Sequence, residues 1–132
     1  MLSDHETYAT LPTSDLGRAR SFYEETLGFS PERQTPIGVH YRAAGGTLFS
    51  VTLSPGAPSG THTQLGFAVR GIDQEVAELR QRGIVFEQYE TPRTEADIAS
   101  TPAGRAAWFK DLDGNLIGLI ELSGLDPSGD LR

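Results

Sequence analysis

Apolar and polar residues alternate along the chain with two periods, and each period predicts one kind of element. The i, i+4, i+7 spacing of a helix face occurs at Ile72, Val76 and Leu79, and a less regular helical spacing occurs at Leu16, Ala19, Tyr23 and Leu27. Asp15 precedes the stretch that begins at Leu16 and is predicted to cap it by accepting from open backbone amides. Gly28 and Gly83 follow the two stretches, where helix ends favour a positive φ. Short apolar runs typical of strands flank both predicted helices.

These elements occur in the same order twice. Residues 8–29 align with 64–86 at an offset of 56 that slips to 55 at the glycines Gly28 and Gly83, and residues 39–53 align with 107–121 at an offset of 68. The second alignment places His40 on Trp108 and Ser50 on Gly118. The change of offset implies about a dozen extra residues, and the Thr-, Pro- and Ala-rich stretch 91–104 is predicted to be the loop that holds them.

Each copy has the element order βαβββ, with one apolar helix face and a small sheet. Because one such unit buries too little surface, two must share a core. The predicted fold class is α+β, with two βαβββ modules that form a curved mixed sheet with the helices outside. We expect a single domain over 1–132, with modules at about 7–54 and 62–122 and a flexible tail at 123–132.

Strand alternation assigns the side chains to two faces. The odd-numbered positions are expected to pack under the helices, among them Tyr41, Phe49, Phe67, Phe109, Ile117 and Leu119. The even-numbered positions are expected to face a groove: Tyr8, Thr10, Pro12, His40, Arg42, Leu48, Ser50, Thr52, Gln64, Gly66, Ala68, Trp108, Leu116 and Ile120. A slip of one residue would invert both sets.

Composition narrows the range of functions. The 132 residues include no cysteine, which excludes disulfides, thiolate metal sites and cysteine nucleophiles. The sequence has no secretory signal pattern and no apolar run of bilayer length, so we expect a cytoplasmic protein that does not enter membranes. The net charge of −7 opposes binding to nucleic acid or anionic lipid. We interpret this charge first as a source of solubility, and attraction of a cationic ligand is the alternative.

Known short motifs add little. Asp111 and Asp113 resemble part of a calcium loop, but Leu122 stands where the bidentate glutamate would be, so the pair is interpreted as turn chemistry around Gly114. The sequence contains no nucleophile elbow, no Walker loop and no dinucleotide fingerprint.

The stretches SDLGRARSFYEETLGF and WFKDLDGNLIGLIEL, within the duplicated pattern, resemble the glyoxalase, bleomycin-resistance and extradiol-dioxygenase superfamily over about residues 7–122. Enzymes of this family hold a divalent metal inside the sheet, and the resemblance places its ligands at Tyr8, Ser50, Gln64 and Gly118. These residues supply neither imidazole nor carboxylate, so no metal and no other cofactor is expected. Gly118 is expected to open space where relatives carry the carboxylate.

The resemblance also implies that Trp108 lies where fosfomycin-resistance relatives contact their substrate. We predict a ligand site made of residues from both modules: Tyr8, Thr10, His40, Arg42, Ser50, Thr52, His62, Gln64, Trp108, Leu116 and Gly118. The predicted partner is a small organic molecule, and the bleomycin-resistance branch implies a homodimer.

The favoured function is a metal-independent protein that sequesters a drug-like or aromatic metabolite, rather than an enzyme. Three alternatives stay open. One is a metal-independent isomerase, lyase or hydrolase with His40, His62 or Tyr8 as acid or base. Another is a metalloenzyme with unusual ligands, such as a site shifted to the two histidines, and the third is an interaction module without a small ligand.

Overall fold

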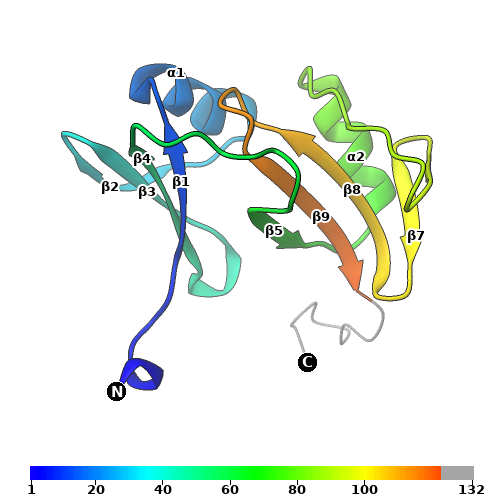
Figure 1. Ribbon diagram of the computed structural model, residues 1–132, viewed down its shortest axis with the longest axis horizontal. Coiled ribbons are helices and arrows are strands. Elements are labelled where there is room, and N and C mark those ends of the chain that lie inside the picture. The colour runs from blue at the N-terminus through cyan, green and yellow to red at the C-terminus, as the bar shows by residue number, and fades with distance from the viewer. Residues whose placement is uncertain (123–132) are drawn as a thin grey trace. The chain divides into compact units, whose positions relative to one another are not determined.

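A computed structural model describes residues 1–122. These residues form two compact units (Figure 1). The first unit contains residues 1–59 and 112–115. The second unit contains residues 60–111 and 116–122. The expected flexible tail, 123–132, lies outside the described residues.

The first unit follows the predicted order of elements. Its elements are a 3-10 turn (Leu2–Asp4), β1 (Ala9–Thr13), α1 (Leu16–Ser21), a π-helical turn (Phe22–Thr26), β2 (Pro31–Thr35), β3 (Gly38–Arg42), a second 3-10 turn (Ala44–Gly46) and β4 (Leu48–Leu53). The sheet order is β1-β4-β3-β2, with β1 parallel to β4 and the other pairs antiparallel.

The second unit repeats this topology. Its elements are β5 (Leu65–Ala68), α2 (Ile72–Gln81), β6 (Thr94–Glu95), β7 (Ile98–Thr101), β8 (Gly104–Lys110) and β9 (Leu116–Leu122). The sheet order is β5-β9-β8-β7-β6, and β5 runs parallel to β9. Figure 1 shows β8 and β9 as long neighbouring strands with α2 on one side of them. The α+β class with two βαβββ modules is therefore confirmed.

The strand registers confirm the internal repeat. His40 pairs with Ser50 between β3 and β4, and Trp108 pairs with Gly118 between β8 and β9. Both pairs differ by the offset of 68 found in the sequence. The parallel pairs β1–β4 and β5–β9 also match at the offsets of 56 and 68. The two modules therefore place corresponding residues at corresponding points of their sheets.

The stretch 91–104 is not the plain loop that the sequence predicted, because it contains β6 and β7. Strand β7 corresponds to β2, because each enters the next strand through a similar turn. The turn TPIG at 35–38 joins β2 to β3, and TPAG at 101–104 joins β7 to β8. Thr35 and Thr101 each donate to the glycine carbonyl three residues later, at 3.4 and 2.7 Å. Most of the extra residues of the second module therefore lie before β7.

The core lies on the predicted face. Tyr41, Phe49, Phe109, Ile117 and Leu119 are all buried, and Phe67 is half-buried. The helix predictions also hold, since Asp15 accepts from the Arg18 amide at 3.1 Å and α2 buries Ile72 and Val76. Gly28 and Gly83 have φ of 86° and 92°. None of the helices within 1–122 is long and apolar enough to cross a membrane.

Candidate functional site

The second unit contains a hollow of about 420 Å³ with aromatic walls, called here the Trp108 hollow. It is lined by the loop 60–63, by residues of the segment after α2, chiefly Glu87, Tyr89 and Pro92, and by Trp108, Lys110 and Leu116 from β8 and β9. The strand residues have the parity that the sequence assigned to the groove face.

Trp108 is fixed by three neighbours. Its indole Nε1 donates to Thr63 Oγ1 at 3.1 Å, and its ring lies 5.4 Å from the Tyr89 ring at 78°. A methyl group placed on Gly118 would lie 3.3 Å from the indole and 3.1 Å from Thr63 Cγ2. Gly118 therefore leaves room for the indole. The sequence predicted open space over Gly118, but Trp108 and Thr63 fill that space.

The polar groups of the hollow have defined roles. Lys110 Nζ lies 3.4 Å from Glu87 Oε1, so the hollow carries a paired cation and anion. The Glu87 amide donates to the Trp108 carbonyl at 2.8 Å, which fixes this segment beside β8. Burial, and then the charge of Glu87, raise the pKa of Tyr89, so its phenol is a neutral hydroxyl that can donate or accept. The site can therefore bind an aromatic body and a few polar groups.

Three predicted site residues meet in this hollow: His62, Trp108 and Leu116. Gln64 is half-buried beside it, and its amide donates to the Leu116 carbonyl at 2.8 Å. Gly118 lies beneath the indole. The second unit thus brings part of the predicted set together.

In the first unit, the predicted residues on β1, β3 and β4 share a sheet face by register, and Tyr8 immediately precedes β1. The Tyr8 ring is 57% exposed and lies 5.6 Å from the ring of His40. Ser50 is buried, with its hydroxyl 3.5 Å from that of Thr52. Thr10 is exposed, and Arg42 binds Glu32 Oε1 and the Gly46 carbonyl, each at 3.1 Å. That all eleven residues contact one ligand stays a prediction.

The four positions that the family resemblance assigned to metal ligands do not suit a metal ion in this chain. The hydroxyl of Ser50 is buried beside that of Thr52, Gly118 is covered by Trp108, and Tyr8 and Gln64 offer only a phenol and an amide. Such a set lacks the imidazole and carboxylate ligands that zinc, iron and manganese require. Among residues 1–122, no three His, Asp or Glu side chains gather as they would around a metal ion.

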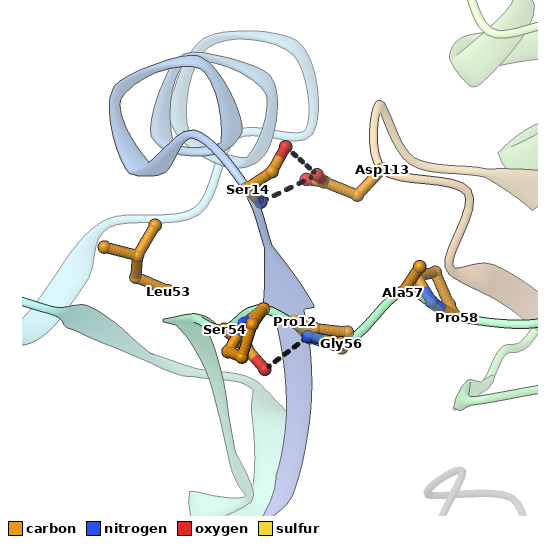
Figure 2. Close-up of a pocket in the computed structure, with 9 residues that line it drawn as sticks. Pro12, Ser14, Leu53, Ser54, Gly56, Ala57, Pro58 and Asp113 are labelled. Atoms are coloured by element: carbon orange, nitrogen blue, oxygen red, sulfur yellow. Dashed lines mark hydrogen bonds between the residues drawn. The ribbon is translucent and has the colours of Figure 1, made fainter.

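A second hollow, of about 620 Å³, lies in the first unit, where β1 ends and the chain leaves β4 (Figure 2). Asp113 Oδ1 accepts from the Ser14 amide at 3.0 Å and from its hydroxyl at 3.2 Å. Ser54 Oγ accepts from the Gly56 amide at 3.2 Å. Because these groups bind one another and the hollow has no aromatic wall, the Trp108 hollow is the better candidate site.

Sequence reasoning missed several residues of the Trp108 hollow. Lys110 has the parity of Trp108 and Leu116, so the alternation could have revealed it. Glu87, Tyr89 and Pro92 lie outside regular strands, where no period assigns a side chain to a face.

Comparison with known proteins agrees with this fold. TnmS3, an antibiotic binding protein from Streptomyces sp. CB03234, is 30% identical over 90% of this chain and 96% of its own, with a TM-score of 0.70. A glyoxalase/bleomycin resistance protein from the same strain is 29% identical over 89% and 100%, with a TM-score of 0.66. The fosfomycin resistance protein FosX from Listeria monocytogenes, 16% identical over 96% and 98% with a TM-score of 0.68, shares the fold.

No curated protein matches the chain. The model of one protein family, however, matches residues 6–119, nearly the whole of the described chain. The matched range includes the first module, the second module as far as Leu119 in β9, and the Trp108 hollow. The chain therefore belongs to the glyoxalase/bleomycin resistance protein/dioxygenase superfamily.

Proposed function

We propose that this protein binds and sequesters a partly aromatic small molecule in the Trp108 hollow, without a metal. The observation that carries this proposal is the pair of nearly perpendicular aromatic walls, Trp108 and Tyr89, with ring centroids 5.4 Å apart. Each ring has a large apolar face and a polar edge, which suits a ligand that combines a planar body with hydrogen-bonding groups.

The size and chemistry of the hollow support the proposal. Its volume of about 420 Å³ lies within the usual range for ligand pockets, roughly 300–1,000 Å³. Such pockets are mostly apolar, with a few polar groups that orient the ligand. Here Leu116 and Pro92 add apolar surface, and the Glu87–Lys110 pair supplies one charge of each sign.

The similarity to TnmS3 supports the same function, since that protein is an antibiotic binding protein and shares 30% of its residues with this chain. The donor set at the four family metal positions favours binding over metal-dependent chemistry. An antibiotic or a comparable metabolite is therefore the proposed class of ligand.

Trp108 is the only tryptophan in the sequence, so its fluorescence reports on this hollow alone. We would titrate the protein with three planar probes, namely neutral naphthol, anionic naphthalenesulfonate and cationic proflavine, and confirm binding by calorimetry. At least one probe is expected to change the Trp108 emission with a Kd of about micromolar order. Calorimetry should show binding retained by Trp108→Phe and lost by Trp108→Ala. If no probe binds, or if Trp108→Ala binds as well as the wild type, the proposal fails.

Native mass spectrometry of freshly purified protein provides a second test. We expect a retained or added ligand to be released with unchanged mass, because binding without turnover alters no bond. The homodimer implied by the family resemblance is proposed here as well and would appear as twice the chain mass. Stoichiometric zinc, iron or manganese in the same spectrum would contradict the metal-independent function.

A further inference from the structure

The second module contains a segment that the first module lacks, residues 88–97, between the strand-like stretch after α2 and β7. It holds β6, the turn at Ala96 and Asp97, and Tyr89, which is one wall of the Trp108 hollow. The turn is unusual because Ala96 and Asp97 both have positive φ, 49° and 72°. Residues other than glycine seldom adopt this conformation unless contacts around them hold it in place.

Arg80 of α2 supplies those contacts. Its Nε donates to Asp97 Oδ2 at 2.7 Å, and its Nη2 donates to the Ala96 carbonyl at 2.8 Å. One planar guanidinium therefore binds both residues of the turn, and a lysine could not reproduce this fork of donors. The turn is thus anchored to the helix by a single side chain.

Hydrogen bonds lead from this anchor to the wall of the hollow. The other Asp97 oxygen accepts from Gln88 Nε2, and Gln88 Oε1 accepts from the Thr94 hydroxyl at 3.1 Å. The same hydroxyl accepts from the Tyr89 amide at 2.9 Å, and the Thr94 amide donates to the Tyr89 carbonyl at 3.0 Å. The backbone of Tyr89 is therefore connected to α2 without a gap.

We infer that the segment 88–97 is the specificity element of the Trp108 hollow and that Arg80 is its positioning residue, which sets where the Tyr89 ring stands against Trp108. This inference rests on the proposed function. Arg80 does not line the hollow, so it acts on the ligand through Asp97, Gln88 and Thr94. Loss of the anchor lets the Tyr89 wall move, which changes the width of the hollow and the fit of a planar ligand.

The test compares Arg80→Ala and Arg80→Lys with the control Arg82→Ala. Arg82 is the C-terminal cap of the same helix and donates to Glu78 Oε1 at 3.1 Å, so both alanine variants remove one surface charge. Trp108 emission is measured in the ligand-free variants, together with probe affinity and the urea midpoint of unfolding. We expect Arg80→Ala to shift the emission and to weaken the best-binding probe about tenfold. Arg80→Lys should recover part of both effects, and Arg82→Ala should change neither.

The outcomes separate the inference from the function on which it rests. If the wild type binds none of the three probes, the proposed function fails, and the emission of the free variants still decides whether Arg80 positions Tyr89. If Arg80→Ala lowers only the urea midpoint and leaves emission and affinity like those of Arg82→Ala, Arg80 is merely structural and the inference is overturned. Should Arg80→Ala not fold, Arg80→Lys and Asp97→Asn, which tolerates the positive φ, decide by the same two measurements.

Discussion

Gly118 and Gly66 lie opposite each other in the parallel pair β9–β5, yet their surroundings differ. A methyl group on Gly118 would come within 3.1 Å of Thr63 and 3.3 Å of Trp108. A methyl group on Gly66 would meet nothing within 4 Å. One glycine is therefore required by a close approach, and the other is not.

We predict that Gly118→Ala moves the Trp108 indole by a few tenths of an ångström and weakens its bond to Thr63. The variant should lose about 1 kcal/mol of unfolding free energy, because crowding at a packed site outweighs the stiffer unfolded chain. Its Trp108 emission should also shift. Urea unfolding followed by fluorescence measures both effects.

Gly66→Ala is the matched control. The added methyl group has no neighbour to crowd, so the variant should gain about 0.5 kcal/mol of unfolding free energy, because alanine restricts the unfolded chain. The Trp108 emission should stay unchanged. Equal effects of the two substitutions would contradict the role assigned to Gly118.

Single residues also show where sequence reasoning succeeds. The repeat offset and the turn at Gly114 were enough to place Trp108 and Gly118 on one face, since a hairpin register follows from its turn. The contact between the indole and Thr63 could not be foreseen, because it depends on the path of the loop 60–63. Tyr89 has no counterpart in the first module, so the repeat gave no template for it.

Among the elements, the two helices begin in different ways. Helix α1 is capped by Asp15, its own preceding residue. Helix α2 is preceded by Gly71, which has no side chain, and Glu121 of β9 accepts from the Ile72 amide at 2.9 Å instead. Arg105 donates to Glu121 at 3.0 Å and holds the carboxylate in place. A sequence motif can reveal the Asp15 cap, which directly precedes its helix. It cannot reveal the Glu121 cap, because Glu121 and Ile72 are far apart in the chain.

The cap from Glu121 predicts a pH dependence of stability. The Ile72 amide, and then Arg105, lower the pKa of Glu121 from its ordinary value of 4.5. A carboxylate whose pKa is lowered by folding stabilises the fold at pH values above its ordinary pKa of 4.5. That contribution disappears as the pH falls through the pKa of the folded state. Glu121→Gln should therefore cost about 1 kcal/mol of unfolding free energy at pH 7 and much less at pH 3. Urea unfolding at the two pH values measures the difference.

Glu95→Gln serves as the control for this experiment. Glu95 is 75% exposed, and its ion pair with Arg93 spans 3.4 Å in solvent. Its substitution should change the unfolding free energy by less than about 0.5 kcal/mol at either pH. A Glu121→Gln effect that is the same at pH 7 and pH 3 would show that the charge of Glu121 does not stabilise α2.

The π-helical turn after α1 gives a further prediction. It carries Glu24, which accepts from the buried Tyr41 hydroxyl at 2.9 Å and from Arg20 Nε at 2.6 Å. Burial and the Glu24 carboxylate raise the pKa of Tyr41, so the hydroxyl remains a donor. Tyr41→Phe should lower the unfolding free energy by about 1.5 kcal/mol, because the hydrogen bond from the hydroxyl to the charged Glu24 is lost. Since Tyr41 lies outside the Trp108 hollow, probe affinity should stay at the wild-type value, and a loss of affinity would contradict the assigned site.

At the scale of the whole molecule, the two offsets of the repeat carried most of the prediction. They placed the pairs β1–β4 and β3–β4 in the same register as β5–β9 and β8–β9, because strand pairing and alternation follow the same period of two. They could not resolve 91–104, where the offset changes and the apolar signal is weak. The shared turns TPIG and TPAG show where the two modules correspond again after the inserted residues. These turns lie 66 residues apart in the sequence, whereas the strands that follow them align at an offset of 68.

The net charge of −7 also acts at this scale. Within the hollow the Glu87–Lys110 pair is neutral overall, whereas the field of the whole surface attracts cations toward the protein and repels anions. Raising the ionic strength from about 0.01 M to about 0.15 M shortens the screening length from about 30 to about 8 Å. Stopped-flow Trp108 fluorescence should then show proflavine associating more slowly, naphthalenesulfonate faster, and naphthol at an unchanged rate. The same salt response for all three probes would mean that local groups, and not the charge of the whole chain, govern entry to the hollow.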